Sequence, residues 1–381
     1  MHKNIGQSEE KIVKKIHGVN LGNWLVLEKW MNVGLFEGVD ADDEVWMVRN
    51  TPKNKMDIIY REHRDNYITE ESFKEIASHG INLVRLPVPY FVFGDREPFT
   101  GCIEYVDKAF EWAEKYGLQI LLDLHTVPGS QNGYDNGGLT GVCKWCKNPQ
   151  ETEFALTVLE RLAERYGNRS GLYGISPVNE PISWLVYMTS PSRGRARDKE
   201  EAKGSGYVPM KFLKNFYFNA YNRMRAKMPE DKTIVFQDGF RLGKWKSFLA
   251  QNSFKNVLLD THIYIFAMEG FVPIHRLWVY RLYVNMNRRA IKRVSKYVPV
   301  VVGEWCISQK YAVNCKDSEE EKRKRFNEVA ELQQKAWDVS AGYIYWSYKL
   351  WDDTDVPMDD PWKEPWDLRR CWKNGWMPDQ F

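Results

Sequence analysis

The sequence predicts an α/β fold in which eight parallel strands close into a (β/α)8 TIM barrel with long loop insertions at the carboxyl-end face. Short apolar runs alternate with amphipathic helical segments along the chain, which is typical of a parallel sheet with crossover helices. The chain has 381 residues, more than the ~250 of a minimal barrel. We therefore expect a single domain over residues 1–381 with the surplus in loops.

The apolar runs define the predicted strands. They lie at 16–20, 81–86, 119–124, 172–178, 233–238, 257–262, 298–304 and 342–347. The fourth run is followed by Asn179, Glu180 and Pro181. Proline cannot donate to a strand ladder, so this strand is expected to stop with Glu180 at the carboxyl rim of the barrel. Taken alone, Glu180 could equally be a strand-end residue that faces solvent.

Amphipathic segments between the strands predict the crossover helices. They lie at 70–79, 103–116, 151–166, 212–227 and 319–337. Thr69 precedes the first of these helices as a candidate N-cap. Gly80 and Gly117 follow the first two, as expected where a helix ends in a left-handed residue, and the third stops at Gly167.

Three segments are longer than a minimal barrel needs, at 25–64, 183–209 and 266–296. Loops of this length in a compact enzyme are usually lids, site walls or mobile segments. The third segment carries Arg288, Arg289, Lys292 and Arg293. We interpret this run as a solvated or partner-contacting helix rather than a phosphate site, because charge runs are most often surface.

Charge and the N-terminal sequence exclude several classes of function. The 54 basic and 51 acidic residues give a net charge of +3, which indicates neither nucleic acid nor an anionic membrane as a partner. No apolar run approaches the ~20 residues of a membrane span. Residues 1–10 contain no apolar stretch typical of an export signal. Unless a leader has been removed, we expect a cytoplasmic protein.

The six cysteines are expected to be thiols in such a protein. Cys143 and Cys146 have the C-x-x-C spacing of a metal or redox pair. No second cysteine pair or histidine cluster completes a zinc site, so we interpret them as ordinary cysteines.

Polar residues gather where the apolar strands end. Six strand ends carry them: Arg85, His125, Asn179, Glu180, His262, Tyr264, Glu304 and Trp346. Each alone has a structural explanation, but burying so many polar groups is costly unless they serve a purpose. Since the carboxyl ends of all strands in a parallel barrel share one face, these side chains are expected to form one site.

Glu180 and Glu304 on the fourth and seventh strands suit glycoside hydrolysis with retention. That reaction needs one protonated carboxyl group and one nucleophilic carboxylate roughly 5–5.5 Å apart. Arg85 and Tyr264 are expected to hold one glutamate ionised, and His262 with a less polar wall to help keep the other protonated. The 16 Trp and 20 Tyr could stack on sugar faces, although an aromatic-rich core would explain them equally well.

Two segments resemble glycoside hydrolase family 5 of clan A. Residues 18–28, GVNLGNWLVLE, followed by Leu-Phe-Glu at 35–37, are similar to the first-strand signature of its exo-β-1,3-glucanase and β-glucosidase branch. Residues 123–136, DLHTVPGSQNGYDN, form a longer and more specific match. The resemblance extends from about residue 16 to residue 378, and it implies a (β/α)8 barrel and a retaining mechanism.

The resemblance also implies a role for each residue. Glu180 would be the acid/base, beside Asn179 on the sugar 2-hydroxyl, and Glu304 the nucleophile, oriented by Arg85 and Tyr264. The remaining residues would bind the sugar: His125, His262 and Trp346 in the same subsite, Glu28, Asp135 and Asn136 at the far end of the terminal sugar, and Tyr134 and Phe266 as rings at the entrance.

We therefore expect an exo-acting retaining β-glucosidase of the 1,3-glucanase type. Its substrate would be a β-glucoside or a short β-glucan oligosaccharide, with no metal and no organic cofactor, because carboxylates and water suffice. The alternatives within enzymes are an endo-β-glucanase, a mannanase, or a glucosidase for plant or lipid glucosides. A carbohydrate-binding relic is disfavoured because both carboxylates are present.

Overall fold

The computed structural model describes residues 15–350 and 358–380. The segment 1–10, on which the prediction of no export signal rests, lies outside these residues. Within them, no helix combines the length and the apolar character that crossing a membrane requires.

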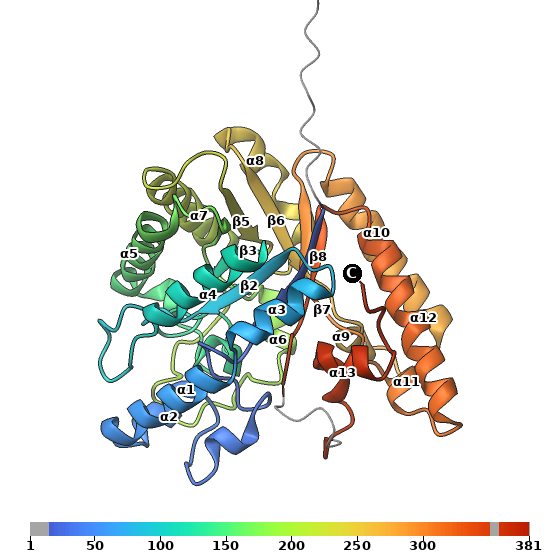
Figure 1. Ribbon diagram of the computed structural model, residues 1–381. Helices are drawn as coiled ribbons and strands as arrows, with labels where there is room; N and C mark the ends of the chain where they lie inside the picture. Colours follow the sequence, from blue (N-terminus) through green and yellow to red (C-terminus); the bar gives the residue numbers. More distant parts are fainter. Residues whose placement is uncertain (1–14, 351–357, 381) are drawn as a thin grey trace, which may run out of the picture.

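Eight strands run parallel and pair in sequence order, and β8 pairs with β1 to close the barrel (Figure 1). They are β1 (Ile16–Asn20), β2 (Leu83–Val88), β3 (Gln119–Leu124), β4 (Leu172–Ser176), β5 (Thr233–Gln237), β6 (Val257–His262), β7 (Val300–Trp305) and β8 (Gly342–Tyr345). The predicted (β/α)8 fold is confirmed. Strand bounds differ from the predicted ranges by up to two residues, as in β2 and β4.

Strand β2 continues through Pro87, where the sequence predicted its end. The carbonyl of Arg85 accepts from the Leu21 N–H at 3.0 Å, so the backbone polar groups of position 85 face β1. Position 87 is two residues further along the strand, and its N–H would therefore face β1 as well. Strand β1 has already ended at Asn20. Proline therefore removes no ladder hydrogen bond there, and β2 carries on past it.

Helices pack around the outside of the barrel (Figure 1). The principal crossover helices are α3 (Glu70–Ser78), α4 (Ile103–Tyr116), α5 (Pro149–Tyr166), α7 (Met210–Arg225), α8 (Lys246–Asn252), α10 (Leu277–Val294) and α12 (Glu319–Trp337). Thr69 caps α3 in a reciprocal capping box with Ser72. Gly117 ends α4 in the left-handed conformation, at φ 71°, as predicted.

The long segments carry short elements of their own. The first holds η1 (Val33–Phe36), α1 (Glu44–Arg49) and α2 (Lys53–Asn66), the second α6 (Trp184–Thr189), and the third α9 (Ile265–Glu269) followed by α10. Because α10 is the crossover helix between β6 and β7, most of the segment 266–296 belongs to the regular barrel. The remaining elements are η2 (Asp135–Gly137), η3 (Trp145–Lys147), η4 (Leu242–Lys244), α11 (Lys310–Val313), η5 (Glu364–Trp366) and α13 (Leu368–Lys373).

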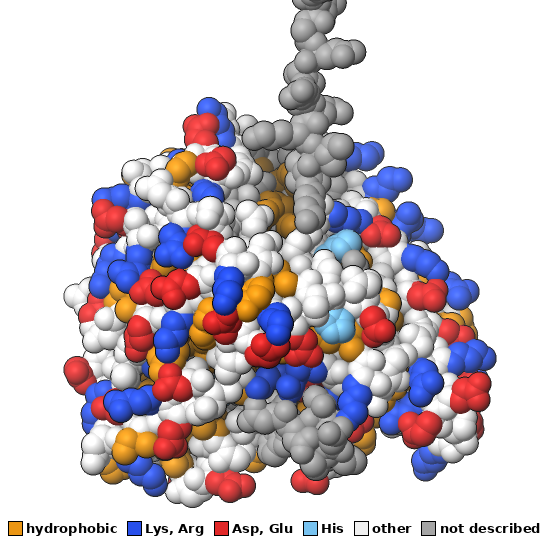
Figure 2. All heavy atoms as spheres, in the orientation of Figure 1, with side chains coloured by type: hydrophobic (Ala, Val, Ile, Leu, Met, Phe, Trp, Pro, Cys, Tyr) orange, Lys and Arg blue, Asp and Glu red, His pale blue; other side chains and the backbone are white. Residues whose placement is uncertain are grey.

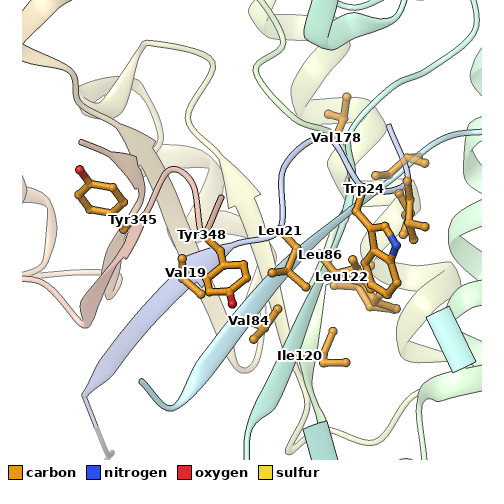
Figure 3. Packing of buried hydrophobic residues seen from close by; sticks show 14 of the residues in the cluster. Val19, Leu21, Trp24, Val84, Leu86, Ile120, Leu122, Val178, Tyr345 and Tyr348 are labelled. Atoms are coloured by element: carbon orange, nitrogen blue, oxygen red, sulfur yellow. The ribbon is translucent and has the colours of Figure 1, made fainter. Parts of the chain in front are cut away.

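Apolar residues fill two layers around the sheet. The larger lies between the strands and the helices and includes Val19, Val84, Leu86, Ile120 and Leu122 (Figure 3). A separate buried cluster consists of one residue from each of seven strands: Ile16, Leu83, Leu121, Val235, Leu258, Val301 and Ile344. Successive residues of a strand alternate between its two faces, so this cluster fills the barrel interior. All six cysteines are free thiols.

Candidate active site

The apolar cluster inside the barrel gives way to polar residues toward the carboxyl ends of the strands. Arg85 lies two positions after Leu83 on β2, and Asp260 two positions after Leu258 on β6. A step of two residues keeps a side chain on the same face of a strand. The barrel interior therefore has an apolar layer and, two residues closer to the carboxyl ends of the strands, a buried polar layer.

Arg85 is the centre of this layer and is fully buried. Its Nη1 donates to Asn20 Oδ1 at 2.9 Å and to Glu304 Oε1 at 2.8 Å. Its Nη2 donates to Asn179 Oδ1 at 2.8 Å and lies 3.0 Å from Asp123 Oδ2. Burial lowers the guanidinium pKa, but the charges of Asp123 and Glu304 raise it above its ordinary value. A permanent cation therefore joins β1, β2, β3, β4 and β7.

Glu304, on β7, has both carboxylate oxygens held by donors. Arg85 donates to Oε1, and the Tyr264 hydroxyl donates to Oε2 at 2.7 Å. His262 Nδ1 lies 3.3 Å from the same Oε2. Burial raises the pKa of Glu304 above its ordinary value, although the positive charges of His262 and Arg85 oppose that rise.

Glu180 follows β4 and adopts the left-handed conformation, with φ 43°. Its Oε1 accepts from His262 Nδ1 at 2.9 Å, and its Oε2 accepts from Asn136 Nδ2 at 3.0 Å. Burial favours a higher pKa, but the hydrogen bond and charge of His262, together with Asn136, hold the pKa of Glu180 below its ordinary value. These contacts therefore favour the ionised form of Glu180.

His262 lies between the two glutamates, and the anions around it favour the protonated imidazole. Its Nε2 donates to Asp260 Oδ2 at 3.2 Å. Burial opposes protonation, but the charges of Glu304 and Asp260 and the bond to Glu180 raise the imidazole pKa well above 6.5. We predicted that His262 would help keep one glutamate protonated. That prediction was wrong: the hydrogen bond and charge of His262 lower the pKa of Glu180, because an imidazolium stabilises the ionised form of the carboxylate it contacts.

His125 and Asn179 form the wall beside Arg85. His125 Nδ1 donates to Asp123 Oδ2 at 2.6 Å, and Asn179 Nδ2 donates to His125 Nε2 at 3.4 Å. The His125 ring stacks on Trp346, with centroids 5.5 Å apart and planes at 12°. Gln131 Nε2 donates to the carbonyls of His125 and Asn179 at 2.8 and 2.9 Å. This amide ties together the loops that follow β3 and β4.

Glu28 and Asp135 form a second acidic pair. Glu28 Oε2 accepts from Trp30 Nε1 at 2.8 Å, and the Glu28 N–H donates to Asn23 Oδ1 at 2.8 Å. Burial and the charge of Asp135 raise the pKa of Glu28 well above its ordinary value. Burial raises the pKa of Asp135 to about 6. Glu28 Oε1 is buried and has no hydrogen-bond partner among the described residues, so it is free to bind a ligand hydroxyl.

Aromatic rings cover another part of the site. Phe266 packs on Tyr264 and on Trp366, with centroids 5.2 Å apart in both pairs. Trp366 also contacts Trp30 at 5.2 Å. Among the described residues the ring contacts of Phe266 do not include Tyr134, which is half-buried. Two entrance rings would hold a sugar between them without touching each other, so the role of Phe266 and Tyr134 at the entrance stays a prediction.

Sequence reasoning missed several members of the network: Asn20, Asp123, Gln131, Asp260 and Trp366. A signal existed for both aspartates, because Asp123 precedes His125 by two residues and Asp260 precedes His262 by two. That spacing places carboxylate and imidazole on the same face of a strand. No spacing rule could have found Trp366, which reaches the site from η5 beyond the last strand.

Three donors in the site could in principle hold a metal ion. One atom each of Glu180, His262 and Glu304 lies within 4.8 Å of the others. Arg85 donates to Glu304 at 2.8 Å, so a metal would compete with a fixed positive charge. The same short separation fits paired catalytic carboxylates, and the prediction of no metal stays a prediction.

Known proteins resemble the chain in sequence and in fold. Residues 39–349 match the family model for cellulase, glycosyl hydrolase family 5. A glucan 1,3-beta-glucosidase of Blumeria graminis is 33% identical over 78% of this chain, which spans 65% of that relative's length. A probable glucan 1,3-beta-glucosidase A of Aspergillus terreus is 29% identical over 95% of this chain and 88% of its own length.

The fold is also that of a rutinosidase from Aspergillus niger, with a TM-score of 0.75, 21% identity, and coverage of 95% of this chain and 97% of that one. The family match spans most of the chain and includes Arg85, Glu180 and Glu304. The chain therefore belongs to glycoside hydrolase family 5, as the sequence resemblance predicted.

Proposed function

We propose that the chain is an exo-acting, retaining β-glucosidase of the glucan 1,3-β-glucosidase type. The observation that carries the proposal is the short separation of the two glutamates, whose nearest ligand atoms lie within 4.8 Å. Retaining glycosidases place their carboxyl groups about 5–5.5 Å apart, whereas inverting enzymes need roughly 6.5–9.5 Å to admit a water molecule. The names of the curated relatives support β-1,3-glucans as the substrate class.

Glu304 is the nucleophile in this proposal. The Arg85 guanidinium and the Tyr264 hydroxyl each hold one of its oxygens, which fixes the orientation of the carboxylate. It attacks the anomeric carbon and forms a covalent glycosyl-enzyme, while the bond to the leaving oxygen breaks. Two charge-assisted donors restrain the carboxylate rotation that would otherwise cost entropy at the transition state.

Glu180 is the acid/base. The proton it gives to the leaving oxygen comes from His262, whose Nδ1 lies 2.9 Å from Glu180 Oε1. Transfer of this proton leaves a neutral imidazole and a neutral carboxyl group, so no net charge enters the buried site. In the second step the ionised Glu180 takes a proton from water, which attacks the glycosyl-enzyme and releases the sugar.

The buried acidic pair Glu28 and Asp135 supports exo action. Glu28 Oε1 is a buried oxygen without a partner among the described residues, and its raised pKa lets the carboxyl group both donate and accept. Asp135 lies in the same acidic region. Sugar hydroxyls can form hydrogen bonds with these carboxyl groups. A chain of glucose units would end at the unit that makes these hydrogen bonds. The pocket would then take the non-reducing terminal glucose.

Product analysis tests the proposal. Short β-1,3-glucan oligosaccharides should release glucose alone, and NMR during the first turnovers should show the β-anomer. Glu304→Gln, purified in parallel and folded by circular dichroism, should release nothing. An initial α-anomer would disprove retention, and mixed oligosaccharide products would disprove exo action in favour of an endo-glucanase.

A further inference from the structure

The outer face of α10, with the loop before it, is exposed and unlike the rest of the surface. We call it the α10 surface. Its apolar members are Phe271, Ile274, Trp278, Leu282 and Met286, and its cations are Arg276, Arg281, Arg288, Arg289, Lys292, Arg293 and Lys296. The opposite face of α10 is buried through Val279, Tyr280, Val284, Ile291 and Val294. Packing of the barrel therefore does not explain the outer face.

Charge on this surface is segregated. No Asp or Glu occurs between Glu269 and Glu304, a stretch that contains seven Lys and Arg residues, whereas the whole chain is nearly balanced. Elsewhere, exposed cations are often paired, as Arg165 is with Asp107. Among the described residues, none of the seven cations takes part in an ion pair. Figure 2 shows Lys and Arg side chains along the edge where α10 and α12 lie in Figure 1.

Large apolar side chains lie among these cations. Trp278, Leu282 and Met286 are 55%, 64% and 59% exposed, and Phe271 is 74% exposed. The spacing of four residues places the first three on one face of the helix. Single exposed apolar residues are ordinary, but a continuous row marks an interaction site.

We propose that the α10 surface docks on an anionic lipid bilayer. Exposed Trp, Phe and Leu beside Arg and Lys are typical of helices that lie in the membrane interface, where apolar groups enter the acyl boundary and cations contact anionic headgroups. Every cation near such a surface contributes, and here no acidic residue of the same segment opposes them.

Two other occupants fit less well. A symmetric contact between two copies would place the same patch on both sides, and seven unpaired cations would face seven others. A bound peptide needs a groove, but the cavities lined by Tyr90, by Phe212 and by Lys147 contain no residue of the α10 surface. A flat, charged partner matches an exposed helix face best.

The apolar end of the surface lies on the catalytic side of the barrel. Strand β6 ends at His262, α9 follows directly, and α10 begins at Leu277. Trp278 and the preceding loop are therefore close in the chain to Tyr264 and Phe266 in the site. Docking through α10 would place the flank of the barrel against the lipid headgroups and would not cover Glu180 or Glu304, which lie inside the barrel.

Vesicle co-sedimentation tests the proposal. The full chain should bind vesicles of equal parts phosphatidylcholine and phosphatidylglycerol, and not vesicles of pure phosphatidylcholine. The triple variant Arg289→Gln, Lys292→Gln, Arg293→Gln should bind about a hundredfold more weakly, since each cation near an anionic surface contributes about a fivefold factor. Trp278→Ser should also weaken binding, because it removes an exposed aromatic ring. It should leave the core intact, because that ring makes no core contact.

The matched control removes three exposed cations from other helices: Lys55→Gln, Arg61→Gln and Lys211→Gln. Its net charge equals that of the first triple variant, and its binding should stay within a few-fold of the unaltered chain. Equal loss in both triples, equal binding to neutral vesicles, or no binding at low ionic strength would each overturn the proposal. Hydrolysis of a soluble aryl β-glucoside should be unchanged in all variants, so this test is independent of the proposed function.

Discussion

In the proposed mechanism, replacing Glu180 with alanine removes the acid/base and leaves the nucleophile Glu304 in place. Proton transfer by a positioned side chain contributes about 10²–10⁴ in rate, which corresponds to roughly 2.7–5.4 kcal/mol of activation free energy. His262 Nδ1 cannot replace Glu180 fully, because it also lies 3.3 Å from Glu304 Oε2 and is drawn toward that carboxylate. We expect the full loss for substrates with a sugar as the leaving group.

The assay compares two leaving groups on the same glucosyl unit. A β-1,3-linked disaccharide should lose about 10²–10⁴ in kcat/KM, whereas dinitrophenyl β-glucoside should lose little, because its leaving oxygen needs no proton. Hydrolysis of the glycosyl-enzyme still needs a general base, so kcat on the aryl glucoside should fall although kcat/KM does not. Azide should restore kcat, since it fills the space left by the carboxyl group and attacks without a general base. The product should be the β-glucosyl azide.

Equal losses on both substrates would refute the acid/base role. So would an α-glucosyl azide, which would mean that no covalent intermediate forms on Glu304. The fold should survive the substitution, because His262 keeps Asp260 at 3.2 Å and Glu304 at 3.3 Å as partners. Circular dichroism and thermal unfolding provide that control.

Further predictions concern the same network. Tyr264→Phe removes a charge-assisted hydrogen bond to Glu304 and should lower kcat/KM about 10- to 100-fold; an unchanged rate would exclude the hydroxyl from catalysis. Since burial raises the pKa of Glu304, activity should decline as pH falls through a value above 4.5, where the nucleophile becomes protonated. Because the pKa of His262 is raised, its imidazole is expected to hold a transferable proton into alkaline solution. His262→Gln should therefore move the alkaline limb of the kcat/KM pH profile to lower pH. An unmoved limb would contradict the proposed proton path. Glu180 has φ 43°, so Glu180→Gly should be about 1 kcal/mol more stable to urea than Glu180→Ala, and a reverse order would argue against backbone strain.

The barrel could be predicted because its signal is repeated. Eight apolar runs, each followed by a helical segment, leave few other topologies. Strand bounds were harder, and Pro87 shows why. Whether a proline ends a strand depends on whether the neighbouring strand still offers an acceptor, and that depends on the relative lengths of β1 and β2. No single run of sequence contains this information.

Site residues that lie at the ends of predicted strands could be predicted from the sequence. Those that reach the site from segments beyond the barrel could not. Asp123 and Asp260 carried a usable signal in their spacing from His125 and His262. Trp366 carried none, because η5 reaches the aromatic rings of the site from beyond the barrel. The proposed cytoplasmic location stays a prediction, since residues 1–10 lie outside the described part of the chain.

The α10 surface could not be predicted from the net charge of the chain. A value of +3 for 381 residues gives no reason to expect an anionic partner, and the sequence argument set such a partner aside. The stretch between Glu269 and Glu304 contains seven cations and no acidic residue. Because the structure places most of these cations on an exposed face of α10 and the loops beside it, this stretch favours an anionic partner. Charges interact over about 8–10 Å at physiological salt, so local balance, and not the total, decides what a surface attracts.

The location of the proton in the site depends on geometry that sequence does not encode. Sequence identified Glu180, His262 and Glu304, and the usual chemistry assigns the proton to one carboxyl group. In the folded chain an imidazole lies 2.9 Å from one carboxylate and 3.3 Å from the other, with Asp260 behind it. Three anions around one imidazole favour its protonated form. In the proposed mechanism the proton therefore starts on His262 and passes through Glu180 to the leaving oxygen, so substitutions of either residue should be compared by their pH profiles and not by their rates alone.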